Sequence, residues 1–221
     1  MSSPMTQNIV LAVTGASGTA YALRLAQILT RSEIHVHLVI SEAARMVTLR
    51  EVGTDLPPDS ASGEVWQTFI DQAFHQPPAS EWGFRQLTQP VTGQISVHEK
   101  RDYSAGIASG SFLTRGMVIC PCSMGTLSSI AGGASTNLIQ RAADVHLKER
   151  RTLILVPRET PLSSIALENM TRLSQAGALV LPSMPGFYHQ PQCLADLVDF
   201  VVARICDQLQ VPHDLMERWG E

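Results

Sequence analysis

The residues best suited to chemistry follow two predicted strands in the second half of the chain. The apolar run Met117–Cys120 predicts a buried strand, which we expect Pro121 to end, and the hydroxyl-rich Cys122–Thr126 follows as a predicted polar loop. A second buried strand, Leu153–Val156, is followed by the pair Arg158–Glu159. Ligands bind beyond the carboxyl ends of strands in an open parallel sheet. The two segments therefore predict a site that holds an anion and places a carboxylate beside it.

A glycine-rich turn, Thr14–Thr19, follows a third apolar run, Ile9–Val13. Such a turn lets backbone N–H groups approach a phosphate at the positive end of the next helix, and Ser17 and Thr19 add hydroxyl donors. The Gly-x-x-Gly spacing differs from the dinucleotide fingerprint, and the turn lacks the lysine of a P-loop. A tight turn without any ligand is the alternative interpretation of this motif.

Four cations and a tyrosine are candidates to meet a phosphorylated ligand: Arg141, Lys148, Arg158, Arg204 and Tyr188. Arg141 and Lys148 are seven residues apart in the predicted helix 137–150 and share one face, for which a solvated basic surface is the alternative. Arg158 beside Glu159 could instead be a structural ion pair, and Tyr188 could serve packing alone. The chain has no aspartate-rich cluster that would bridge a diphosphate through Mg²⁺. A monophosphate held directly by side chains, without a metal, is the better match.

Strands that alternate with helices position these residues. His35 and His37 alternate in the predicted strand Ile34–Ile40, and we expect them on one solvated or helix-facing side rather than as metal ligands. Ser41 is well placed to cap the helix that follows. The pattern predicts a doubly wound, Rossmann-like (flavodoxin-like) α/β fold, with three layers and a mainly parallel sheet. We expect one domain over residues 1–221, with weak signals from 52 to 91 apart from a helix at 65–74.

Composition excludes several classes of function. The formal net charge is −4, which disfavours broad binding to nucleic acid or to anionic membranes. The first apolar run is far too short to span a bilayer. Four cysteines without framework spacing indicate reduced thiols in a cytoplasmic protein. Cys120 and Cys122 could suggest metal or redox chemistry, but no Cys/His cluster in the sequence completes a zinc site.

Six motifs along the chain are highly specific when taken together. They are Thr14–Thr19 (TGASGT), Cys120–Thr126 (CPCSMGT), Asn137–Asp144 (NLIQRAAD), Leu147–Arg151 (LKERR), Val156–Pro161 (VPRETP) and Pro185–Pro191 (PGFYHQP). This set resembles the flavin prenyltransferases, long called 3-octaprenyl-4-hydroxybenzoate or aromatic-acid decarboxylases. The resemblance covers nearly the whole chain and is weakest from about residue 52 to 103.

The resemblance implies a flavin site and a prenyl-phosphate site. FMN would bind at Gly15, Ala16, Ser17, Ser41, Ser123, Met124, Gly125, Thr126 and Arg158. Some relatives carry lysine where this chain has Gly125, so only backbone contacts are expected there. Dimethylallyl phosphate would lie near Lys148, Tyr188 and Arg204, and Arg141 would help to stabilise the leaving phosphate. Glu159 would be the key carboxylate, and Ser17 would help to shuttle protons.

The resemblance also implies an activity and an assembly. The enzyme would join a dimethylallyl group to N5 and C6 of reduced FMN and supply the prenylated FMN to a partner decarboxylase in ubiquinone biosynthesis or aromatic-acid decarboxylation. It would form a homo-oligomer, expected to be a dodecamer, in which Glu51 and Trp219 are candidates to reach a neighbour's site. The alternatives are a phosphopantothenoylcysteine-type decarboxylase and a non-catalytic FMN carrier.

Overall fold

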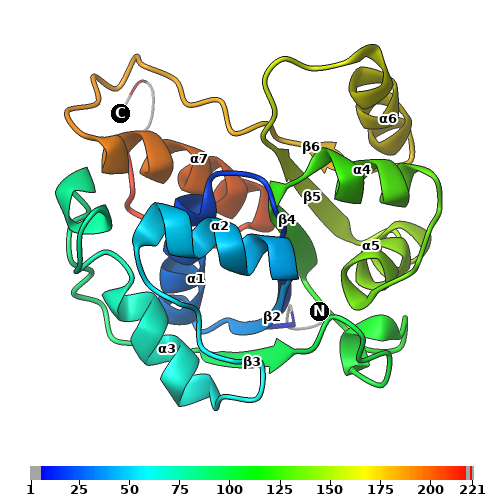
Figure 1. Cartoon of the computed structure of the whole chain (residues 1–221), viewed down its shortest axis with the longest axis horizontal. Coiled ribbons are helices and arrows are strands. Elements are labelled where there is room, and N and C mark those ends of the chain that lie inside the picture. The colour runs from blue at the N-terminus through cyan, green and yellow to red at the C-terminus, as the bar shows by residue number, and fades with distance from the viewer. Residues whose placement is uncertain (1–5, 218–219, 221) are drawn as a thin grey trace.

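The fold is built on one parallel sheet. The computed structural model describes residues 6–217 and residue 220. Within them, six strands pair in the order β3-β2-β1-β4-β5-β6, every neighbouring pair being parallel (Figure 1). The strands are β1 Asn8–Val13, β2 His35–Ile40, β3 Gln94–His98, β4 Gly116–Cys122, β5 Thr152–Pro157 and β6 Leu179–Val180.

Helices cover both faces of the sheet. In chain order they are α1 Thr19–Arg31, α2 Glu42–Val52, α3 Gly63–Gln72, α4 Met124–Ala131, α5 Leu138–Lys148, α6 Ser164–Gln175 and α7 Leu194–Leu209, with short 3₁₀ turns η1 Ala79–Trp82 and η2 Gly106–Ala108. One buried core joins α1, α3 and α7 to the sheet, and a second joins α4, α5 and α6 to its other face (Figure 1). The three-layer, doubly wound α/β prediction is confirmed.

The central strand explains why its sequence is apolar without interruption. Along β1, Ile9, Leu11 and Val13 belong to one core, whereas Val10 and Ala12 belong to the other. Successive side chains of a strand point to opposite faces, so a strand that is covered on both faces must be apolar at every position. This buried strand delivers the Thr14–Thr19 turn to the edge of the sheet.

Serine and asparagine caps fix where five of the helices begin. Ser41, Ser62, Ser123, Asn137 and Ser163 each accept a hydrogen bond from the backbone N–H three residues later. Such caps satisfy one of the free amides of the first turn. The capping role predicted for Ser41 is confirmed. The polar loop predicted at Cys122–Thr126 is wrong beyond Ser123, because α4 begins at once after this cap.

The end of β4 also differs from the prediction. Pro121 does not end the strand, which continues to Cys122. Residue Cys122 pairs with Pro157 after a register shift in the ladder, so an irregularity rather than a strand end accommodates the proline. Burial raises the pKa of the Cys122 thiol to about 12 and also raises that of Cys120. Both thiols are therefore protonated near neutral pH, which argues against thiolate chemistry at this pair.

Three histidines, His35 and His37 of β2 and His98 of β3, lie together on the sheet face that points away from α1 and α3. His37 is only 6% exposed; its ring lies 3.0 Å (Nδ1 to Nε2) from His98 and 3.1 Å (Nε2 to Oδ1) from Asn8. Phe112, from the segment before β4, packs edge-on against His37 with ring centroids 5.1 Å apart. The expected solvated or helix-facing position is thus wrong for His37, since a loop covers it. Sequence periodicity gave no sign of that loop.

We expect the protein to lose stability in mild acid because buried imidazoles must become charged. Burial, with smaller effects from His35 and His98, lowers the pKa of His37 to about 3, and burial lowers that of His146 to about 4. These values lie below the unfolded-state value of about 6.5, so the stabilisation is complete above that pH and is lost as the pH falls. The loss should be on the order of 2 kcal/mol per imidazole between about pH 7.5 and about pH 5.

Urea unfolding at the two pH values measures this loss. In His37→Gln the unfolding free energies at about pH 7.5 and about pH 5 should differ by about 2 kcal/mol less than in the wild type, which is the contribution of one imidazole. An unchanged pH dependence in that variant would show that His37 does not contribute.

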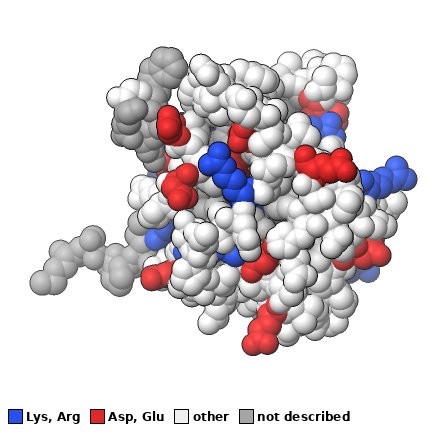
Figure 2. All heavy atoms as spheres, turned by 90° about the vertical axis from the view of Figure 1, so that its left-hand side faces the viewer, with Lys and Arg blue, Asp and Glu red and all other residues white. Residues whose placement is uncertain are grey.

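The surface carries charges of both signs. Figure 2 shows Lys and Arg interspersed with Asp and Glu on the face that includes α3, in keeping with the small net charge of −4. Among residues 6–217 and 220, no helix has both the length and the apolar character that crossing a membrane would require.

Candidate functional site

The site lies where the order of the strands reverses. From β1 the chain moves outward through β2 and β3, and it then returns to the other side of β1 with β4, β5 and β6. Thr14 ties the two turns at this switch point: its Oγ1 donates to the Pro121 carbonyl at 2.7 Å and accepts from the Ser123 N–H at 2.8 Å. Crevices at such switch points bind ligands in open α/β sheets.

An acidic side chain occupies part of the first turn. Glu51, from the last turn of α2, accepts hydrogen bonds from the amides of Gly18 and Thr19 and from the Ser17 hydroxyl at 2.5 Å. The first amides of α1, which the sequence suggested for a phosphate, therefore already hold a carboxylate. Glu51 lies at its own chain's site, whereas the sequence suggested a neighbour's. The amides of Gly15 and Ser17 make no hydrogen bond within the described residues.

Arg158 and Glu159 extend from the end of β5 into the same region. The Arg158 Nε donates to the Ser17 carbonyl at 3.2 Å, which joins the turns after β1 and β5. Glu159 is exposed, and its carboxylate accepts only from the Thr160 N–H at 3.1 Å among the described residues. Arg158 and Glu159 form no ion pair with one another among the described residues. The alternative of a structural ion pair between them is therefore wrong.

The amino terminus of α4 offers unused donors beside this pair. Ser123 caps the helix through the Thr126 amide, while the amides of Met124 and Gly125 make no hydrogen bond within the described residues. Open space surrounds Gly125, since a Cβ placed there would meet nothing within 4 Å. Free amides at a helix amino terminus favour an anionic group. Ser41 directly follows β2 and caps α2. We call these residues at the carboxyl ends of β1, β2, β4 and β5 the strand-end residues, and the site that they form the strand-end site.

Two of the predicted phosphate ligands lie elsewhere. Lys148 is the last residue of α5, where it forms an ion pair with Glu149. Four residues later β5 begins at the amino edge of the sheet, where Thr152 pairs with Gly116 of β4. The seven residues of β4 separate this amino edge from the Ser123 edge by about 20 Å. Lys148 is therefore remote from Arg158 of its own chain.

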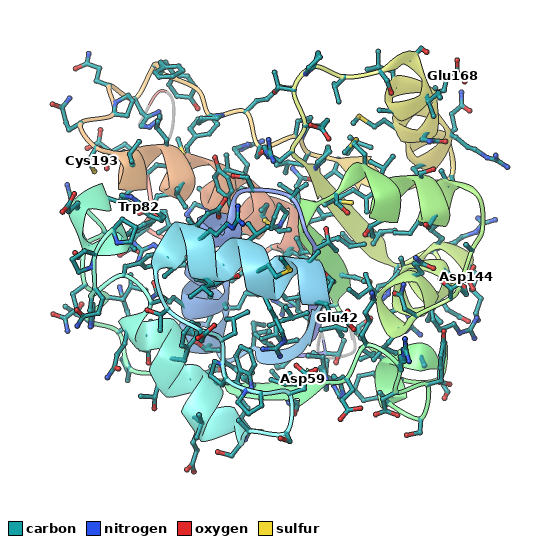
Figure 3. The ribbon with its side chains drawn as sticks, viewed as in Figure 1. Glu42, Asp59, Trp82, Asp144, Glu168 and Cys193 are labelled. Carbon is teal, nitrogen blue, oxygen red and sulfur yellow. The ribbon has the colours of Figure 1, made fainter. Side chains whose placement is uncertain are left out.

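Arg141 likewise faces away from the switch point. Its Nε donates to the Ala108 carbonyl at 3.0 Å, and its NH1 pairs with Asp144 at 2.9 Å. Figure 3 shows Asp144 on the outer side of α5. The shared helix face of Arg141 and Lys148 thus lies beside residues 108–110, before β4, and not at the switch point of its own chain.

The remaining predicted ligands lie around α7. Arg204 is half-exposed and pairs with Asp207 at 2.7 Å. Tyr188 is 50% exposed and its ring lies edge-on to Phe200, with centroids 5.7 Å apart. No hydrogen bond or ion pair of the described residues links either side chain to Arg158 or Ser17. Trp219, the candidate to reach a neighbour, lies outside the described residues.

The Gly15→Ala substitution should disturb the Thr14–Thr19 turn, because a Cβ there would lie 2.5 Å from the Ala43 Cβ on α2. Overpacking of this kind costs about 1–3 kcal/mol. We expect a lower melting temperature and weaker FMN retention. Gly132→Ala is the matched control, since its Cβ would meet no atom closer than 3.4 Å, and it should leave both properties nearly unchanged. Equal behaviour of the two variants in flavin-fluorescence titration would contradict the assigned packing.

Fold and site together define a flavoprotein, and comparison with known proteins agrees. The sequence matches the Flavoprotein family over residues 2–206. It is 51% identical over 221 residues to the flavin prenyltransferase UbiX of Pseudomonas aeruginosa, covering 100% of this chain and 97% of that protein. The chain belongs to the flavin prenyltransferase family.

Solved structures share the fold. The crystal structure of AnUbiX in complex with FMN and dimethylallyl pyrophosphate is 36% identical, with a TM-score of 0.79 over 97% of this chain and 98% of that one. A dodecameric FMN-dependent UbiX-like decarboxylase from Escherichia coli O157:H7 is also 36% identical, with a TM-score of 0.76 over 97% and 100% of the two chains. The family expectation from the motifs is confirmed.

Proposed function

We propose that this protein transfers a dimethylallyl group from dimethylallyl phosphate to N5 and C6 of reduced FMN. The observation that carries the proposal is the switch-point site, in which a glycine turn, a capped helix and Arg158 meet beside an exposed carboxylate. Membership of the flavin prenyltransferase family and a relative that binds FMN with a prenyl diphosphate support it. We place the activity in a single domain over residues 1–221, in the cytoplasm.

The strand-end residues fit a phosphorylated flavin. The free amides of Met124 and Gly125 and the guanidinium of Arg158 are suited to a phosphate, and the space around Gly125 leaves room beside them. Gly15, Ala16, Ser17, Ser41, Ser123 and Thr126 supply the remaining small or hydroxylic positions. Reduced FMN, when bound, supplies the nucleophilic atoms of the reaction.

Two carboxylates are placed to manage protons. Glu159 is exposed at the end of β5, next to the residue that contacts the Ser17 turn, and is free to accept a proton from the flavin. The Ser17 hydroxyl already donates to Glu51 at 2.5 Å, so this pair provides a second route for a proton. Departure of phosphate leaves developing negative charge on oxygen, which cationic side chains stabilise.

Sites shared between subunits would bring those cations in. Arg141 and Lys148 lie away from the switch point of their own chain, so they contribute to the reaction only by meeting the Arg158 edge of another copy. Tyr188 and Arg204, both exposed, are proposed to bind the prenyl phosphate at the same junction. A homo-oligomer, by family likeness a dodecamer, meets this requirement, and the related dodecameric structure supports it. The product would pass to a prenyl-FMN-dependent decarboxylase.

The reaction is proposed to need no metal, because side chains meet the charge of the leaving phosphate. Single-turnover formation of prenylated FMN should therefore proceed equally with and without EDTA. Inhibition by EDTA that Mg²⁺ reverses would overturn the metal-free mechanism while leaving the transferase assignment intact.

A further inference from the structure

Three aromatic rings pack together where the loop after β6 meets α7. The His189 imidazole is stacked on Phe200 of α7, with ring centroids 5.2 Å apart and planes inclined by 18°. The Tyr188 ring meets both of them edge-on, with centroids 5.9 Å from His189 and 5.7 Å from Phe200. Phe200 packs in turn against the core that joins α1, α3 and α7 to the sheet. We call Tyr188, His189 and Phe200 the aromatic cluster.

The backbone before α7 fixes the direction of the two loop residues. The Gln190 N–H donates to the Phe187 carbonyl at 3.0 Å, which closes a β-turn. Tyr188 and His189 are the two central residues of this turn. Just before it, Gly186 runs so close to the tyrosine ring that a Cβ there would lie 3.1 Å from the Tyr188 Cε1. The positions of the two rings therefore depend on the surfaces against which they pack.

The His189 side chain contributes a flat ring rather than hydrogen bonds. Both of its ring nitrogens are buried, and neither has a hydrogen-bond partner among the described residues. A buried polar group without a partner costs about 1–3 kcal/mol, which the packing of the ring must offset. Stacking on Phe200 therefore fixes the imidazole in place, and a phenyl side chain would keep the same stack.

Tyr188 depends on these contacts because its surroundings are open. Its side chain is half-exposed, and it lines, together with His189, a cavity of about 360 Å³ into which an unsupported ring would turn. Arg204, which is proposed to meet the same prenyl phosphate, lies four residues after Phe200 and thus on the same face of α7. A phosphate that contacts both Tyr188 and Arg204 therefore requires the tyrosine to stay beside Phe200.

We propose that His189 is a positioning residue of the prenyl-transfer reaction: its stack on Phe200 holds the Tyr188 ring where the prenyl phosphate binds. The role rests on the proposed function, because that function assigns Tyr188 to this substrate. In this role His189 touches no reacting atom. Loss of its ring should weaken binding of the prenyl phosphate and leave FMN binding unchanged, since the flavin is assigned to the strand-end residues.

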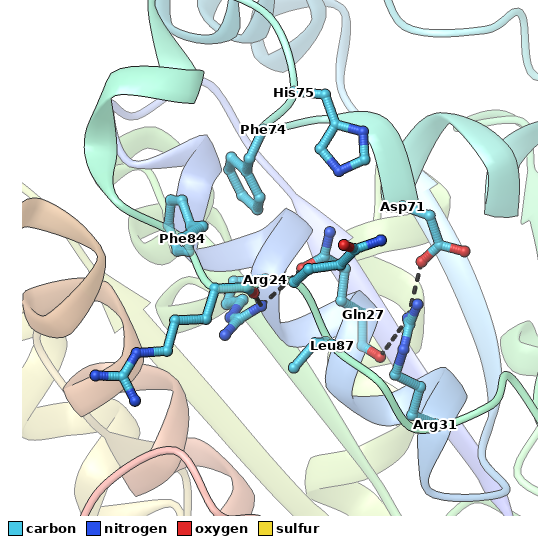
Figure 4. Close-up of a pocket in the computed structure, with 10 residues that line it drawn as sticks. Arg24, Gln27, Arg31, Asp71, Phe74, His75, Phe84 and Leu87 are labelled. Carbon is cyan, nitrogen blue, oxygen red and sulfur yellow. Dashed lines mark hydrogen bonds and ion pairs between the residues drawn. The ribbon is translucent and has the colours of Figure 1, made fainter.

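Calorimetric titration of dimethylallyl phosphate into protein loaded with oxidised FMN measures this effect. His189→Ala should weaken binding by about tenfold, whereas His189→Phe, which keeps the stack, should bind within about twofold of the wild type. In a Tyr188→Ala background the His189→Ala change should have no further effect, because His189 then has no tyrosine to hold. His75→Ala is the matched control: this exposed histidine follows α3, on the wall of a cavity at the end of that helix (Figure 4), and its loss should leave the affinity unchanged.

Three results would contradict the positioning role. The first is wild-type affinity in His189→Ala, and the second is an equal loss in His189→Phe, which would assign the effect to a ring nitrogen. The third is an undiminished loss in the Tyr188→Ala background. If His189→Ala fails to fold, Phe200→Leu removes the other half of the stack and should weaken binding severalfold. A folded Phe200→Leu protein with wild-type affinity would count against the role in the same way.

Nitration of tyrosines by tetranitromethane tests the aromatic cluster independently of activity. The reagent modifies the ring carbons beside the hydroxyl, and one of these in Tyr188, Cε1, lies against Gly186. Tyr103 is 49% exposed against 50% for Tyr188 and is an internal standard in the same protein. Peptide mass spectrometry should show that His189→Ala raises the nitration of Tyr188 severalfold relative to Tyr103, and that His189→Phe does not. An unchanged ratio would overturn the positioning role, whereas a raised ratio in a protein that cannot bind dimethylallyl phosphate would overturn the proposed function alone.

Discussion

Glu159→Gln should slow prenyl transfer by about a hundredfold or more, the usual effect of losing a positioned acid–base group. The amide keeps the shape of the side chain but cannot accept the flavin proton. The Glu159 carboxylate is exposed and contacts only the neighbouring Thr160 amide within the described residues, so the change should leave folding and FMN binding intact. Rapid-quench measurement of a single turnover gives the rate directly.

Glu168 supplies the control for this change. It is an exposed glutamate on α6, at the periphery of the molecule (Figure 3). Glu168→Gln should react at the wild-type rate. A Glu159→Gln protein that matches it in rate would remove Glu159 from the mechanism.

Subunit mixing should restore activity to two inactive variants. Lys148 lies at the amino edge of the sheet and Glu159 beyond the carboxyl edge, so we expect each site to take these residues from different chains. In hetero-oligomers of Glu159→Gln and Lys148→Ala subunits, about one quarter of the sites would then receive both intact residues if mixing is random. Co-expression with two affinity tags, followed by tandem purification, yields the mixed assembly for assay.

The same experiment separates shared from private sites. If one chain supplied both residues, every site of a mixed oligomer would carry one defect, and the activity would remain that of the parent variants. A mixed assembly of two Glu159→Gln subunits with different tags controls for the purification and should remain slow.

Local rules predicted much of the fold from sequence. The predicted bounds of the last helix, Leu194–Leu209, match α7, because an apolar stripe of helical period marks its whole length. The buried strands β1 and β5 were predicted to within a few residues, since double coverage makes their sequences apolar throughout. Ser41 was predicted as a cap because its side chain acts on residues close in sequence.

Tertiary contacts account for what the sequence did not predict. Nothing local shows that β4 passes through Pro121, which depends on its register with β5. The carboxylate of Glu51 reaches the Ser17 turn across 34 positions of sequence, and Thr14 reaches Ser123 across 109. The motif resemblance made Glu51 a candidate to reach a neighbour's site, whereas its carboxylate contacts the Ser17 turn of its own chain. The seven-residue spacing of Arg141 and Lys148 gave their common face but not the edge of the sheet at which Lys148 lies.

Mass spectrometry of the flavin tests the central claim most directly. The purified protein is incubated anaerobically with reduced FMN and dimethylallyl phosphate, and the small molecules are then separated from it. We predict a new flavin whose mass exceeds that of reduced FMN by C5H8, a dimethylallyl group less the hydrogen that it replaces, formed in catalytic excess over the protein and with release of inorganic phosphate. Recovery of unmodified FMN alone, from protein that binds FMN, would contradict the transferase function and leave a flavin carrier.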